Sequence, residues 1–126
     1  GLERRPRLVA VARRLARTFQ IQDRARFCVA TVGEDQIPIA DAYYLFNPFA
    51  ESLFGPEAHI DPDIDVSESR HARDVSTACR LLHDAPAGTF VITYHGFGGR
   101  VPPGYEVVCV DRALPGVLRM WRKVPG

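Results

Sequence analysis

The chain has 126 residues, of which 46% are hydrophobic and 25% are charged, and its formal net charge is +1. This length corresponds to one domain of ordinary size over 1–126, and the composition is that of a soluble globular chain. Because no apolar run approaches the roughly 20 residues of a membrane span and no signal peptide is visible, we expect a cytoplasmic protein without a membrane partner.

The amino-terminal part of the chain combines many arginines with apolar residues at helical spacing. The apolar stripe consists of Leu8, Ala12, Leu15 and Phe19, and Pro6 suits the first turn of a helix. We therefore predict an amphipathic helix over about 6–19. The arginines could contact nucleic acid, but we favour the simpler reading, in which they form the solvated face of that helix.

Two apolar segments follow, and each predicts a strand. Residues 25–32 end at the breaker Gly33-Glu34-Asp35. Residues 40–49 are aromatic and aliphatic, which suits a strand buried on both faces. Pro48 lacks a backbone N–H, so this strand must end near Asn47. Asn-Pro is also a common turn initiator, and a strand that simply ends in a turn is the plainer alternative.

The middle of the chain, 49–66, is rich in prolines and acids, and we predict an exposed loop there. The run 61–65 looks like a calcium loop, but Val66 and Ala72 stand where such a loop needs Gly and Glu. Ser67 can cap a second helix that ends near 84–88. No metal site is predicted, and Cys28, Cys79 and Cys109 are interpreted as small buried hydrophobic residues in a reducing compartment.

The carboxyl-terminal third predicts a strand over 89–94 and a hairpin of strands 105–110 and 116–124. The order of elements favours an α/β fold, with a mostly parallel sheet and a C-terminal antiparallel hairpin. We expect the strand that ends at Phe46 to lie parallel to and beside 89–94, and the hairpin to extend the sheet on the far side of 89–94.

Ligands of open α/β sheets bind beyond the carboxyl ends of the strands, which is where Asn47 and His95 fall. His95 could act as a general base near neutral pH or could be a hydrogen-bonded structural residue. The glycines of 96–99 do not form a phosphate loop, because the prolines Pro102 and Pro103 prevent a helix from starting after them. They more simply allow an unusual backbone at the edge of a site.

The order of motifs runs from Gly1-Leu2-Glu3 through Ala-Asp-Ala-Tyr-Tyr-Leu-Phe-Asn-Pro-Phe to Thr-Tyr-His-Gly-Phe-Gly-Gly and Pro-Pro-Gly-Tyr. It resembles the class I S-adenosylmethionine-dependent methyltransferases across nearly the whole chain. The resemblance implies a partial Rossmann-like methyltransferase fold. In the family's strand order, the strand 27–31 should be displaced from the sheet of the other strands or should leave an unpaired edge. The resemblance begins at the end of the family's second strand, so the first strand and its Gly-rich loop have no counterpart. We therefore expect an incomplete domain that belongs to a longer chain.

The resemblance also implies roles for individual residues. The cofactor is S-adenosylmethionine, with Glu3 on its ribose hydroxyls, Thr31 at the place where the family reads the adenine, and Asn47 beside the transferred methyl group. The expected catalytic cluster is Asn47, Phe49, Tyr94 and His95. Asn47 would bind the nucleophile, the Phe49 ring would face the sulfonium, and His95 would remove a proton. The methyl acceptor is unknown, and methylation at N, O or C stays open.

Three functions are compatible with these observations. The first is methyl transfer by an incomplete enzyme domain, which alone should not bind S-adenosylmethionine usefully. The second is a non-catalytic α/β remnant that acts as a binding or interaction module. The third, which we favour least, is nucleic-acid binding by the arginine helix. A sheet edge without a neighbour would also allow self-association.

Overall fold

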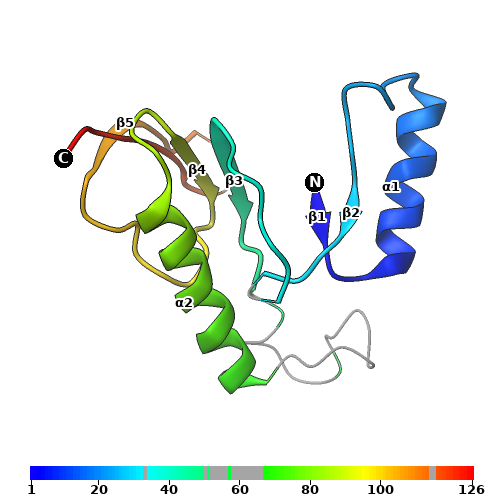
Figure 1. Ribbon diagram of the computed structural model, residues 1–126, viewed down its shortest axis with the longest axis horizontal. Helices are drawn as coiled ribbons and strands as arrows, with labels where there is room; N and C mark the ends of the chain where they lie inside the picture. Colours follow the sequence, from blue (N-terminus) through cyan, green and yellow to red (C-terminus); the bar gives the residue numbers. More distant parts are fainter. Residues whose placement is uncertain (33, 50, 52–56, 58–66, 114–115) are drawn as a thin grey trace. The chain divides into compact units, whose positions relative to one another are not determined.

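The computed structural model describes residues 1–32, 34–49, 51, 57, 67–113 and 116–126. They form two compact units, Gly1–Gln36 and Ile37–Gly126, each with its own sheet (Figure 1). Most of the predicted loop 49–66, including the run compared with a calcium loop, lies outside the described residues. Whether both units belong to the single domain expected from the chain length stays a prediction.

The first unit contains strand β1 (Leu2–Glu3), helix α1 (Pro6–Thr18) and strand β2 (Cys28–Val29). Helix α1 confirms the predicted helix to within one residue, with Pro6 in its first turn and Phe19 as its C-cap. Its buried residues are Val9 and Ala16. The predicted apolar stripe is largely exposed instead, and Phe19 is 69% exposed. The small two-stranded sheet that α1 contacts leaves that stripe uncovered.

The predicted strand 25–32 is much shorter in the structure. Strand β2 covers two residues and pairs in parallel with β1, with Leu2 opposite Cys28 and Glu3 opposite Val29. Its length is limited by β1, which offers only two residues for pairing. Within the described part of the chain, β2 is not a member of the larger sheet, which confirms its predicted displacement.

The second unit contains β3 (Ala42–Phe46), α2 (Glu68–Asp84), β4 (Phe90–Tyr94), β5 (Tyr105–Asp111) and β6 (Leu118–Lys123). The strand order is β3-β4-β6-β5. Strands β3 and β4 are parallel, as predicted, and β6 is antiparallel to both β4 and β5. The hairpin thus lies on the predicted side of β4. The expectation of a mostly parallel sheet is wrong here, because only the β3–β4 pair of this sheet is parallel.

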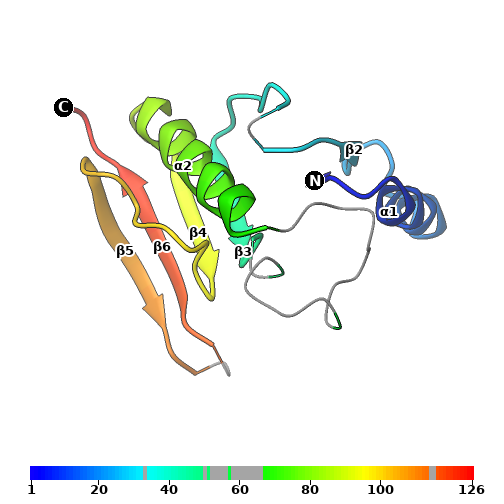
Figure 2. The ribbon, with the colours of Figure 1, turned by 90° about the horizontal axis from the view of Figure 1, so that it is seen from below.

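Helix α2 lies over one face of the four-stranded sheet (Figure 2). Val91 and Thr93 of β4 are 0% and 2% exposed, whereas Tyr44 and Phe46 of β3 are 59% and 58% exposed. The register places Tyr44 and Phe46 on the opposite face from Val91 and Thr93. The prediction that this strand is buried on both faces is therefore wrong. Among the described residues, only one face of the sheet is covered.

Both ends of α2 are fixed by specific hydrogen bonds. At the N-terminus the Ser67 hydroxyl accepts a hydrogen bond of 3.3 Å from the Arg70 N–H, as predicted from the N-cap preference of serine. At the C-terminus the Tyr105 hydroxyl donates to the Leu82 carbonyl at 2.8 Å. The Lys123 ammonium also donates to the carbonyls of Leu82 and His83. The hairpin therefore satisfies carbonyls that the last turn of a helix leaves without partners.

The cysteine prediction is corrected by the structure. Cys28 and Cys109 are exposed free thiols, and Cys79 is only partly buried. Cys28 lies on the two-residue strand β2 and Cys109 lies on β5, an edge strand of its sheet, so neither position is covered. No described helix is long and apolar enough to cross a membrane.

Candidate functional site

The carboxyl ends of β3 and β4 lie next to each other because the two strands are parallel and in register, with Phe46 opposite Tyr94. Asn47 follows the first strand and His95 follows the second. The Asn47 N–H donates to the Gly96 carbonyl at 3.1 Å, which joins the two segments beyond the ladder. Asn47 and His95 both have positive φ, 40° and 61°. Such backbone conformations are costly for residues other than glycine and concentrate at functional sites.

Three rings form an aromatic cluster at this edge of the sheet, which we call the aromatic shelf: Phe46, Tyr94 and His95. The Phe46 and Tyr94 rings stack with centroids 5.4 Å apart and an interplanar angle of 8°. The His95 ring lies 4.3 Å from Tyr94 and 6.5 Å from Phe46. Tyr94 and His95 were predicted as site residues from the sequence, but Phe46 was not. Phe46 directly precedes Asn47, but its contact with Tyr94 follows only from the strand register, which pairs the two residues.

Gly116, just before β6, sets the position of the His95 ring. A Cβ built on Gly116 would lie 2.4 Å from His95 Cε1, 2.6 Å from Nε2 and 2.9 Å from Nδ1. Real Cβ atoms essentially never approach other atoms so closely. Any side chain at Gly116 would therefore displace the imidazole. This contact could not be predicted from the sequence, because it depends on the path by which the chain passes His95 before it enters β6.

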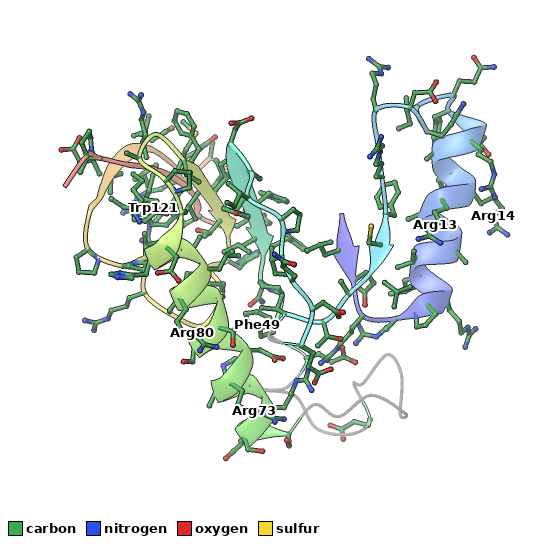
Figure 3. All side chains as sticks on the ribbon, viewed as in Figure 1. Arg13, Arg14, Phe49, Arg73, Arg80 and Trp121 are labelled. Atoms are coloured by element: carbon green, nitrogen blue, oxygen red, sulfur yellow. The ribbon has the colours of Figure 1, made fainter. Side chains whose placement is uncertain are left out.

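Phe49 lies apart from the aromatic shelf. Its side chain is buried, at 8% exposure, and it lies beside α2 (Figure 3), with its ring edge-on to His71 at 6.5 Å. The His71 ring contacts the Phe49 carbonyl through Nδ1 at 3.2 Å. A carbonyl can only accept, so Nδ1 carries the proton. Within the described residues, no ring contact joins Phe49 to Tyr94 or His95.

The residues expected to hold the cofactor's adenosine belong to the first unit. One carboxylate oxygen of Glu3 accepts from the Arg5 backbone N–H at 2.9 Å and from the Arg5 guanidinium at 3.1 Å. The Thr31 N–H donates to the Asp35 carboxylate at 2.7 Å. The six predicted site residues are thus divided between the two units, with Glu3 and Thr31 in one and the other four in the second.

Two further observations bear on the chemistry. Burial raises the pKa of the Tyr105 phenol above its ordinary value of 10.0, and the neighbouring Tyr43 raises it further. The Tyr105 hydroxyl caps the end of α2, so its raised pKa reflects a structural role and not a role at the candidate site. No group of three His, Cys, Asp or Glu side chains within the described ranges is arranged to hold a metal ion.

No family model and no curated protein matches the chain. Among solved structures it is similar to HI0767 of Haemophilus influenzae, a proposed methylase, with a TM-score of 0.55 and 13% sequence identity. The match covers 98% of this chain and 71% of that chain. At this identity the likeness concerns the fold, which is a mixed α/β fold of the kind found in that protein.

Proposed function

We propose that this chain is part of an enzyme that transfers a methyl group from S-adenosylmethionine to an acceptor molecule. One observation carries the proposal: parallel strands β3 and β4 end together in Asn47 and His95, bridged by the hydrogen bond from Asn47 to Gly96. The fold likeness to a proposed methylase supports it. We further propose that the fold is a partial Rossmann-like one, which matches the resemblance carried by the sequence motifs.

Asn47 is suited to binding the nucleophile. Its backbone N–H is used by Gly96, but no described residue hydrogen-bonds its side-chain amide, which is partly exposed. An amide there can donate to or accept from a methyl acceptor and hold it in line for displacement, which supplies much of the rate of such reactions. S-adenosylmethionine, when bound, supplies an electrophilic methyl carbon on a sulfonium.

The aromatic shelf is better suited than Phe49 to face a cation. The Phe46 ring is 58% exposed and stacked on Tyr94, whereas the Phe49 ring is 8% exposed and packed against His71. A cation over an aromatic face gains about 0.5–2 kcal/mol. We therefore assign this contact to the shelf and a packing role to Phe49. The exposed His95 imidazole, held beside Tyr94, can accept a proton from an acceptor that must lose one.

The direct test is a calorimetric titration of the 126-residue chain with S-adenosylmethionine. We expect no micromolar binding, because the Glu3 carboxylate is engaged by Arg5 and no segment resembles the family's Gly-rich loop. Binding should appear when a segment with a first strand and its glycine loop is added in front of the chain. Micromolar binding by the 126-residue chain itself would show that the cofactor loop has been assigned wrongly.

The alternative is a non-catalytic α/β module that binds a partner. The exposed Tyr44 and Phe46 side chains on the uncovered sheet face favour it, because exposed apolar patches often mark interaction surfaces. The same titration separates the two functions. If the extended chain folds but still fails to bind S-adenosylmethionine, the interaction module becomes the better proposal.

A further inference from the structure

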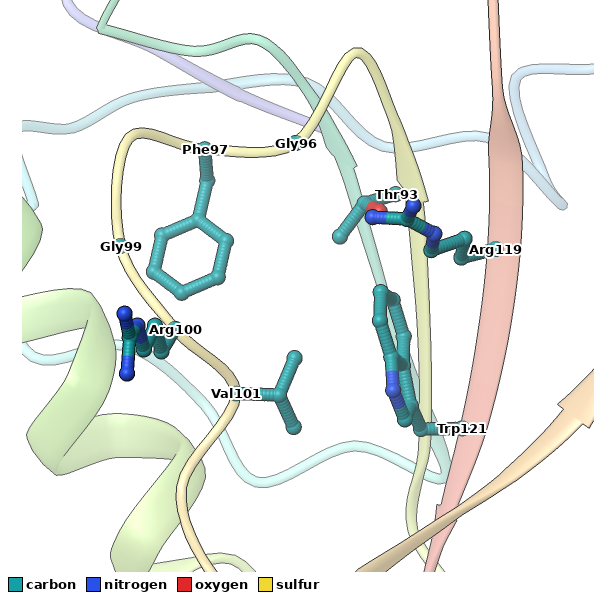
Figure 4. A pocket seen from close by; sticks show the side chains of 8 residues that line it. All are labelled: Thr93, Gly96, Phe97, Gly99, Arg100, Val101, Arg119 and Trp121. Atoms are coloured by element: carbon teal, nitrogen blue, oxygen red, sulfur yellow. The ribbon is translucent and has the colours of Figure 1, made fainter.

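A cavity of about 270 Å³ lies between β4, β6 and the loop that follows β4 (Figure 4). Phe97 and Val101 lie on one side of it, and Thr93, Arg119 and Trp121 on the other. It contains none of the six residues predicted for the methyltransferase site. The strand register brings Thr93, Arg119 and Trp121 to one side of the cavity. Thr93 pairs with Arg119, and Trp121 points to the same face of β6 as Arg119.

The cavity explains the glycine motif that did not fit a phosphate loop. A Cβ on Gly99 would lie 2.7 Å from the Phe97 ring and 2.9 Å from Val75 of α2. A side chain there would push Phe97, which is 2% exposed, away from its buried position. Gly99 therefore allows the loop to fold close to α2 and to form the apolar wall of the cavity.

The lining combines the flat surface of Trp121 with the polar residues Thr93, Arg100 and Arg119. The indole of Trp121 is partly exposed, whereas the Phe97 ring is 2% exposed and supports the wall from behind. Aromatic ligands prefer wide planar surfaces such as an indole. The guanidinium of Arg119 and the hydroxyl of Thr93 lie together on neighbouring strands (Figure 4). No described acid forms a salt bridge with Arg119, and a guanidinium binds carboxylate and phosphate groups well.

We propose that this cavity binds a planar aromatic ligand that carries one anionic group. The rings lie along Trp121, and the anion is bound by the exposed guanidinium of Arg119. The volume is near the lower end of ligand pockets, about 300 Å³, which suits one or two fused rings. The cavity lies on the face of the sheet opposite to Phe46 and Tyr94 of the aromatic shelf, so the ligand class does not rest on the proposed function.

Trp121 makes the test specific, because it is the only tryptophan of the chain. Its fluorescence and its single indole N–H resonance report on the cavity directly. The probes are naphthoate, which has rings and a charge, naphthyl methanol, which has rings alone, and acetate, which has the charge alone. We expect naphthoate to bind about tenfold more tightly than naphthyl methanol, since a charge-assisted hydrogen bond contributes about that much, and acetate to leave the indole signal unchanged.

Arg119→Gln should abolish the preference for naphthoate. Arg122→Gln is the matched control: it changes the same strand, but Arg122 lies on the opposite face, over the Phe90 ring at 5.7 Å. Circular dichroism of each variant checks that the fold is kept. Arg119→Lys should restore part of the preference, which identifies charge as the cause even if Arg119→Gln is destabilised.

The ligand class is wrong if naphthoate and naphthyl methanol bind equally, or if Arg122→Gln weakens naphthoate as much as Arg119→Gln does. These outcomes do not depend on methyl transfer.

Discussion

Replacing Gly116 with alanine tests how the candidate site is held together. The new Cβ would lie 2.4–2.9 Å from three atoms of the His95 ring, so either the ring or the chain before β6 must move. Overpacking of this kind costs about 1–3 kcal/mol. Because His95 is exposed, its side chain can rotate away from the new methyl group. The cost of Gly116→Ala is then the loss of the contact between the His95 and Tyr94 rings. Such aromatic contacts are worth about 0.5–1.5 kcal/mol, so we expect a loss near 1 kcal/mol.

A double-mutant cycle with His95→Ala isolates this contact. Urea unfolding gives the free energy of unfolding of the wild type, each single variant and the double variant. In the His95→Ala background the clash is absent, so Gly116→Ala should cost close to nothing, and the coupling energy should be about 1 kcal/mol. Gly104→Ala is the control: its φ is +86° and its Cβ would meet nothing within 4 Å, so its backbone cost should be the same with or without His95. Equal costs of Gly116→Ala in both backgrounds would refute the proposed packing.

Two further substitutions test the candidate site and the helix that supports the sheet. In an extended chain active in methyl transfer, Asn47→Ala should lower turnover more than cofactor affinity, because its role is at the reacting centre; unchanged turnover would remove Asn47 from the mechanism. Ser67→Ala should lower the free energy of unfolding by about 1 kcal/mol, because it removes the hydroxyl that accepts from the Arg70 N–H. Ser76→Ala is the control, because Ser76 is exposed in the interior of α2, and an equal loss there would argue against capping by Ser67.

The elements of the second unit were largely predictable from the sequence. Ser67, Pro48 and the β-branched run 89–94 act through local backbone preferences, which a sequence displays directly. The parallel pairing of β3 with β4 followed from the helix between them. The hairpin was expected on the far side of β4. Which of its strands pairs with β4, and in which direction, was not predicted, so the parallel character of the whole sheet was overestimated.

The errors concern burial, which depends on what covers an element. The apolar run 40–49 was predicted to form a strand buried on both faces, yet Tyr44 and Phe46 are more than half exposed because nothing described covers that face. The stripe of α1 is exposed for the same reason. At the site, the pairing of Phe46 with Tyr94 and the approach of Gly116 to His95 require the strand register and the path of a distant segment. Neither is encoded in local spacing, so the sequence alone placed Asn47 and His95 but not their neighbours.

Tyr105 should make the second unit less stable at alkaline pH. Burial raises the pKa of its phenol above 10.0, with a further contribution from Tyr43, so the folded state favours the protonated hydroxyl that donates to the Leu82 carbonyl. A group whose folded pKa is raised contributes stability that is fully present below the unfolded pKa. That stability is lost as pH rises through the folded pKa. At neutral pH, Tyr105→Phe should therefore cost about 1 kcal/mol, the usual net value of a hydrogen bond.

As the pH rises above 10, the difference in free energy of unfolding between wild type and Tyr105→Phe should shrink. The Tyr105 phenol of the wild type then loses the proton that it donates to the Leu82 carbonyl, whereas phenylalanine does not titrate. Urea unfolding of both proteins from about pH 7 to about pH 11.5 measures this difference directly. Tyr44→Phe is the matched control, because Tyr44 is 59% exposed on the uncovered sheet face and caps no helix. A difference between wild type and Tyr105→Phe that stays constant over this range would show that the protonated hydroxyl does not hold the end of α2 against the hairpin.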